Sequence, residues 1–132
     1  MSRGRQQHDA RRAAVSALGR QLSRRARNKC ELCEAHTSLQ VIEVEPVFED
    51  PDVDRAVMVC DRCVGLIQVG KRGIQDPGTL RFLEGTVWAE VLPAQLAAVR
   101  ATRLLAADGV DWATELLDGL YLDDDTAALL GG

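Results

Sequence analysis

The sequence has 132 residues and a mass of 14.4 kDa, which is enough for one modest domain and too little for a two-domain enzyme with a deep cleft. Hydrophobic residues make up 46% and aromatic residues only 4%, so a core must be built mainly from Leu, Val and Ala. No apolar run reaches the roughly 18 residues of a membrane span, and the first residues lack the apolar segment of a secretory signal. We therefore expect a cytoplasmic protein without membrane contact.

The formal net charge of −4 hides a strong asymmetry along the chain. Residues 1–29 carry nine basic side chains and one acidic one, whereas the chain from Leu104 onward carries seven acidic side chains and no basic one. This asymmetry indicates a basic arm that either binds an anionic partner or pairs with the acidic end of the same or a neighbouring subunit. The candidate nucleic-acid contacts in the arm are Arg11, Arg12, Arg20, Arg24, Arg25, Arg27 and Lys29.

The arm also carries an aliphatic stripe. Val15, Leu18 and Leu22 follow one another at spacings of three and four, which predicts an amphipathic helix over about 10–26. Gly19 lies inside this helix and costs roughly 1 kcal/mol relative to alanine, so the helix needs a surface on which to dock. We expect the stripe to dock and the arginines to point outward.

Two segments rich in β-branched residues follow, at 38–48 and 56–60. They predict strands, and the intervening "EDPDVDR" supplies the Pro and Asp of a turn, so an antiparallel hairpin is the simplest arrangement. The segment "GKRGIQDPG", 70–78, contains many residues that break regular structure and predicts a loop.

The last third of the sequence has a helical pattern. Pro93 suits the first turn of a helix that Gly109 would end, and Asp111 is expected to cap a further helix over about 112–120. Aspartates 123–125 can cap a last short turn. The side chains expected in the core here are Trp88, Trp112, Leu116, Leu117 and Leu120.

Four cysteines form two pairs, in "NKCELCEAH" and "MVCDRCVGL". They are Cys30, Cys33, Cys60 and Cys63. Two residues within each pair allow a tight turn that aims both sulfurs at one point, and a hairpin over the 26 residues between the pairs can bring the turns together. Four thiolates in a tetrahedron suit one Zn²⁺ per chain, so the spacing predicts a zinc ribbon. An iron site, a redox pair and disulfides are the weaker alternatives.

A shell of four cysteines leaves no open coordination position, so we expect the metal to be structural and not catalytic. Lys29 and Arg62 flank ligands and either offset the negative charge of the site or are solvated. His36 is expected at the surface and not as a ligand. With only two histidines and no phosphate-binding loop, the sequence lacks the groups of a familiar catalytic mechanism.

Five segments occur in a recognisable order and spacing: "KCELCEA", "SLQVIEVEP", "VMVCDRC", "VWAEVLPAQLAAVRATRLL" and "WATELLDGLYLDDDT". From about Leu22 to Leu130 the chain resembles the zinc-ribbon portion of the PhnA family, bacterial proteins named after alkylphosphonate utilisation. The resemblance implies that the four cysteines form the metal site. The sequence differs from the family in its longer arginine-rich arm, in Glu34 where the family has glycine, and in ending at "ALLGG" without the usual C-terminal β-rich domain.

We therefore expect an α+β protein, with a small zinc-ribbon hairpin flanked by an N-terminal basic helix and a C-terminal helical segment. The expected segments are the arm (1–27), the ribbon (28–70), a connecting segment (71–92) and the acidic helices (93–132). The favoured hypothesis is a non-enzymatic module that is regulatory or associated with nucleic acid through its arm. The alternative is a protein–protein adaptor that uses the acidic helices, and an accessory role in phosphonate metabolism is a distant third. No small-molecule substrate is indicated.

Overall fold

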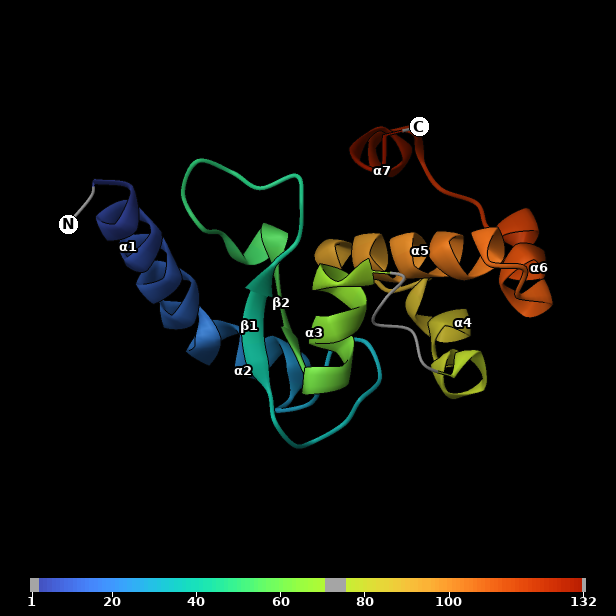
Figure 1. Cartoon of the computed structure of the whole chain (residues 1–132), viewed down its shortest axis with the longest axis horizontal. Helices are drawn as coiled ribbons and strands as arrows, with labels where there is room; N and C mark the ends of the chain where they lie inside the picture. Colours follow the sequence, from blue (N-terminus) through green and yellow to red (C-terminus); the bar gives the residue numbers. More distant parts are fainter. Residues whose placement is uncertain (1–2, 71–75, 132) are drawn as a thin grey trace.

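The computed structural model describes residues 3–70 and 76–131. Its elements are α1 (Arg3–Ala17), α2 (Gly19–Ala26), β1 (Gln40–Glu43), η1 (Val53–Arg55), β2 (Ala56–Val59), α3 (Asp61–Gln68), η3 (Pro77–Leu80), α4 (Leu83–Thr86), α5 (Leu92–Ala107), α6 (Asp111–Gly119) and α7 (Asp124–Leu129). The hairpin and α3 lie in the middle of the molecule, with α1 at one end of its long axis and α6 at the other (Figure 1). This mixture of helices with a small antiparallel sheet agrees with the predicted α+β class.

The structure has two helices where the sequence predicts one over about 10–26. It begins at Arg3, and the break between α1 and α2 falls at Leu18, next to Gly19. A Cβ atom on Gly19 would lie 3.9 Å from the side chain of Val41 in β1, so the junction passes close to the sheet. Leu22 is fully buried, and it forms a small core cluster with residues of β2.

The hairpin forms as predicted but its strands are shorter. Gln40 pairs with Val59 and Glu43 with Ala56, in antiparallel register. Beyond β1 the ladder extends by one hydrogen bond, from the Val44 amide to the Arg55 carbonyl at 2.8 Å. Pro46, which has no N–H to donate, then ends the pairing, so the predicted strand over 38–48 is wrong in its last part.

Helix α3 was not anticipated from the sequence. It begins directly after Cys60, and its buried side chains are Cys63 and Leu66. The second cysteine pair therefore lies at the start of a helix and not in a second tight turn. Of the predicted loop over 70–78, residues 71–75 lie outside the described residues, and residues 77–80 form η3.

The C-terminal helices match the expected pattern with two corrections. Pro93 lies in the first turn of α5, and Gly109 follows its end with a φ of 87°. Asp111 is the first residue of α6 and not its cap, because Val110 occupies the cap position without a side-chain hydrogen bond. Asp123 does cap α7, since its carboxylate accepts from the Thr126 amide at 2.7 Å.

The side chains expected in the core of this part are less buried than predicted. Trp88 is 51% exposed, because its neighbour Val87 takes the inward position and is fully buried. In α6 only Ala113 is buried. The larger side chains there are half-buried against the second core cluster: Trp112, Leu116, Leu117 and Leu120.

One core cluster joins the cysteines to the C-terminal half. It contains Cys30, Cys60 and Cys63 together with Leu96 and Ala97 of α5. The segments that carry the cysteines therefore share their core with the longest helix. Within the described part of the chain, no helix is long and apolar enough to cross a membrane.

Candidate metal centre

The first cysteine pair lies in a tight turn that its own backbone holds closed. The Cys30 amide donates to the Ala35 carbonyl at 2.7 Å, and the Glu34 amide donates to the Cys30 carbonyl at 2.9 Å. The Cys33 amide points at the Cys30 sulfur, at 3.5 Å. Glu34 adopts a left-handed conformation with a φ of 68°, which is the conformation that favours glycine.

The second cysteine pair lies at the N-terminus of α3. Cys60 is the residue that precedes the helix, and Cys63 lies in its first turn, where the Val64 amide donates to the Cys60 carbonyl at 2.9 Å. A helix N-terminus stabilises nearby negative charge. This helix end favours negative charge on both sulfurs, but the contact with Cys30 and burial oppose it at Cys63, and burial opposes it at Cys60.

The four sulfurs form one compact cluster. All four Sγ atoms lie within 4.8 Å of one another, and those of Cys33 and Cys60 are 3.5 Å apart. Tetrahedral ligands at a Zn–S distance of about 2.3 Å stand about 3.8 Å from each other. Three of the cysteines are buried, Cys33 is half-buried, and all four are free thiols. The cluster therefore fits a single metal ion, and a soft four-sulfur donor set fits zinc.

The cluster already favours one thiolate. A hydrogen bond from Cys63 lowers the pKa of Cys30 to about 4. The same contact, together with burial, raises the pKa of Cys63, and burial raises that of Cys60. Cys30 is therefore the more acidic partner of the Cys30–Cys63 contact, and a cation bound by the sulfurs would displace thiol protons.

The residues beside the ligands have different roles. A hydrogen bond with Cys33 raises the pKa of Arg62, and this contact brings the guanidinium beside the cluster. Of the two alternatives for Arg62, its position beside the cluster favours charge compensation over simple solvation. Lys29 is half-buried, with no contact to a cysteine sulfur among the described residues. His36 is exposed, as expected.

Arg11, one of the candidate nucleic-acid contacts, is occupied within the fold. Its guanidinium donates to both carboxylate oxygens of Glu43 in β1, at 2.8 and 2.6 Å. It also donates to the carbonyls of Phe48 and Glu49. This fork fastens α1 to β1 and to the segment that follows it.

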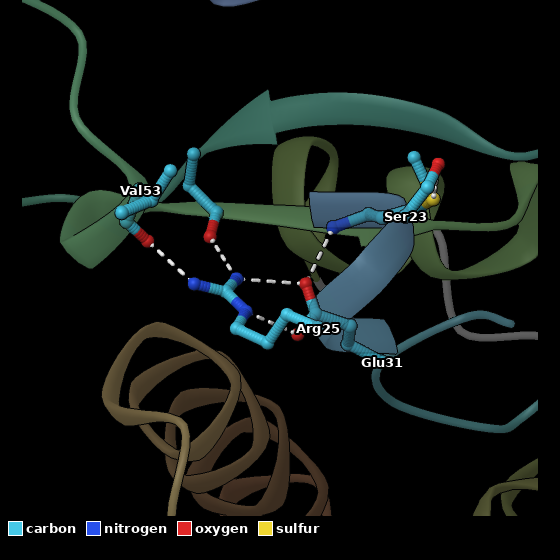
Figure 2. Close-up of polar contacts among 6 residues, drawn as sticks. Ser23, Arg25, Glu31 and Val53 are labelled. Carbon is cyan, nitrogen blue, oxygen red and sulfur yellow. Dashed lines mark hydrogen bonds and ion pairs between the residues drawn. The ribbon is translucent and has the colours of Figure 1, made fainter. Parts of the chain in front are cut away.

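Arg25 forms a second fork of the same kind. It donates to both carboxylate oxygens of Glu31, each at 2.8 Å, and to the carbonyls of Val53 and Ala56 (Figure 2). Glu31 also accepts from the Met58 amide at 2.9 Å. This fork fastens α2 to the first cysteine turn and to β2.

The remaining candidate arginines face solvent. Arg12, Arg20, Arg24 and Arg27 are exposed. The last three follow one another at spacings of four and three, on α2 and at its C-terminal cap. Residues at such spacings share one helix face, so α2 carries a basic row, defined here as Arg20, Arg24 and Arg27.

A groove of about 750 Å³ lies between α1 and β1. Its lining includes His8 and Arg12 from α1 and Gln40 from β1, and it contains no Phe, Tyr or Trp side chain.

Sequence reasoning missed the acidic partners of the two forks. Glu31 stands between two ligands, and Glu43 lies 32 residues from Arg11. A glutamate between two cysteines gives little indication in the sequence that it will bind a distant arginine. The spacing of Cys63, Leu66 and Ile67 is the signal from which α3 could have been found.

Comparison of the chain with protein-family models, with curated proteins and with solved structures finds no match. Fold and site therefore define the class of protein, which is a mixed helix and sheet chain whose four cysteines are close enough to bind one metal ion. Within residues 3–70 and 76–131, no second group of three or more histidine, cysteine or acidic side chains gathers its ligand atoms in this way.

Proposed function

We propose that this protein is a non-enzymatic zinc-binding module that binds the phosphate backbone of nucleic acid through the basic row on α2. The main support for this proposal is that the basic row lies on the solvent-facing side of α2. Its three exposed arginines project from a helix whose opposite side is fixed by the buried Leu22 and by the Arg25 fork. A rigid helix with outward arginines is a surface suited to a polyanion.

The zinc is structural in this proposal. Four cysteines complete the tetrahedral shell, so no coordination position is open for water or substrate. Its binding energy then contributes to folding, since the ligands come from two segments that are separate in the unfolded chain. The support from this chain is that Cys30, Cys60 and Cys63 belong to the core cluster that also contains Leu96 of α5.

The resemblance to the zinc-ribbon portion of the PhnA family supports the metal site and not a reaction. Two features of the chain agree with it, namely the gathered cysteines and the left-handed backbone at Glu34, where the family has glycine. The family name implies no activity for this chain. The proposal assigns no residue a role in phosphonate chemistry.

A salt titration tests the nucleic-acid part. We expect zinc-loaded protein to bind a duplex oligonucleotide weakly, with a log–log salt slope that falls by about 0.9 for each phosphate contact removed. The variant R20Q/R24Q/R27Q should therefore flatten the slope by about 2.7. Changing the base sequence should alter affinity little, because backbone contacts carry no sequence information.

An acidic row on α6 provides the matched control and the alternative function. Asp111, Glu115 and Asp118 are exposed and have the same spacings of four and three. The variant D111N/E115Q/D118N should leave oligonucleotide binding unchanged or slightly stronger. A protein adaptor that uses the acidic helices would behave in the opposite way, losing its partner with this variant and keeping it with R20Q/R24Q/R27Q.

A further inference from the structure

The Arg25 fork joins the basic helix to both halves of the metal centre. Glu31, which receives the fork, lies between the ligands Cys30 and Cys33 in the sequence. Its backbone amide donates to the Met58 carbonyl at 2.8 Å, and its carboxylate accepts from the Met58 amide at 2.9 Å. Met58 belongs to β2, two residues before the ligand Cys60. One carboxylate thus connects α2, the first cysteine turn and the strand that leads to the second pair (Figure 2).

The Arg25–Glu31 ion pair is sensitive to any movement of the first cysteine turn. The Glu31 side chain is 4% exposed and that of Arg25 is 23% exposed. A bidentate arginine–carboxylate pair needs both partners in one plane and at one distance, and a largely buried charge without its partner is strongly unfavourable. Displacing the cysteine turn would therefore leave Arg25 without its anion and would loosen α2.

The remaining contacts of α2 reach the same short segment. Leu22 is fully buried in the cluster that contains Ala56 and Met58, and the Ser23 hydroxyl lies 3.6 Å from the Met58 sulfur. The Arg25 guanidinium also donates to the Ala56 carbonyl at 2.8 Å. Helix α2 is therefore docked on the strand that leads to Cys60 and on Glu31 in the first cysteine turn, with further packing against β1.

We propose that Glu31 and Arg25 are positioning residues that couple zinc binding to the presentation of the basic row. Zinc holds the cysteine turn, the turn holds Glu31, and Glu31 holds α2 with its arginines outward. The coupling is reciprocal, so docking of α2 raises zinc affinity by the factor by which zinc favours docking. This inference rests on the proposed nucleic-acid binding only for its functional consequence.

The test compares Glu31→Gln with Glu43→Gln in the zinc-loaded full chain. Both substitutions remove the acceptor charge of an arginine fork, but Glu43 receives Arg11 from α1 and lies outside the cysteine turn. We expect E31Q to weaken zinc binding by about 10- to 100-fold in competition with a chromophoric chelator, the range typical of groups that orient metal ligands. E43Q should retain the zinc affinity of the unmodified chain.

Hydrogen exchange supplies a readout that is independent of zinc affinity. In E31Q the amides of α2 should lose protection about fivefold or more, while those of α5 keep theirs. In E43Q the amides of α2 should keep their protection. A duplex oligonucleotide should bind E31Q more weakly than E43Q at low salt. If E31Q does not fold, Arg25→Lys, which keeps the charge and loses the fork, should produce the same losses in smaller measure.

The outcomes separate the two proposals. Equal zinc affinity and equal α2 protection in E31Q and E43Q would overturn the coupling, whether or not oligonucleotide binds. Failure of the zinc-loaded unmodified chain to bind oligonucleotide would overturn the proposed function, and the zinc and exchange measurements would still decide the coupling.

Discussion

At the scale of single residues, Glu34 shows what the first cysteine turn requires of its sequence. Its amide closes the turn on the Cys30 carbonyl, and its φ of 68° lies in the left-handed region. A side chain in this region costs roughly 1–2 kcal/mol. Its carboxylate is exposed, so no burial offsets the strain.

Replacing Glu34 with glycine should therefore stabilise the zinc-loaded protein. The relief of strain is partly offset by the greater freedom of glycine in the unfolded chain, which leaves a gain of about 0.5–1 kcal/mol. Denaturant unfolding measures this difference. Ala35→Gly is the control, because Ala35 has no left-handed φ and the substitution should destabilise. A loss of stability in E34G as large as in A35G would contradict the interpretation.

At the scale of elements, α2 owes its position to its neighbours and not to its own propensity. It has eight residues and no side-chain N-cap, and helices this short are marginal alone. Leu22 supplies the buried contact, and the left-handed residues Arg27 and Asn28 turn the chain from the helix into the cysteine turn. Docking is therefore what makes the basic row a fixed surface.

Leu22→Ala should undock this helix. Truncating a fully buried leucine costs about 2–5 kcal/mol, whereas Leu18→Ala, at a half-buried position of the same stripe, should cost clearly less. Chemical denaturation of both variants in the presence of zinc gives the comparison. Equal costs would show that Leu22 does not anchor α2.

At this scale, local sequence patterns could be predicted and tertiary contacts could not. The cysteine spacing and the β-branched segments are local patterns, so the cluster and the hairpin were predictable. The arginines are alike in sequence, and only tertiary contacts distinguish Arg11 and Arg25, which bind glutamates, from Arg20 and Arg24, which face solvent. Helix α3 was missed because its short apolar stripe overlaps the second cysteine pair.

At the scale of the whole molecule, basic and acidic surfaces stand far apart. The basic row belongs to α2, which lies beside the hairpin near the middle of the molecule, and α6 lies at the end of the long axis away from α1 (Figure 1). The acidic row of α6 therefore does not neutralise the basic row within one chain. The cysteines share a core cluster with α5, so a metal ion held by them would stabilise both the hairpin and the C-terminal helices.

The central claim is that Cys30, Cys33, Cys60 and Cys63 together hold one zinc ion. Elemental analysis of protein purified without chelator tests it most directly, with Cys60→Ser as the matched variant. The predicted result is one zinc per unmodified chain and loss of that zinc in the variant. Protein that contains no metal, contains iron in place of zinc, or has its cysteines in disulfides would contradict it.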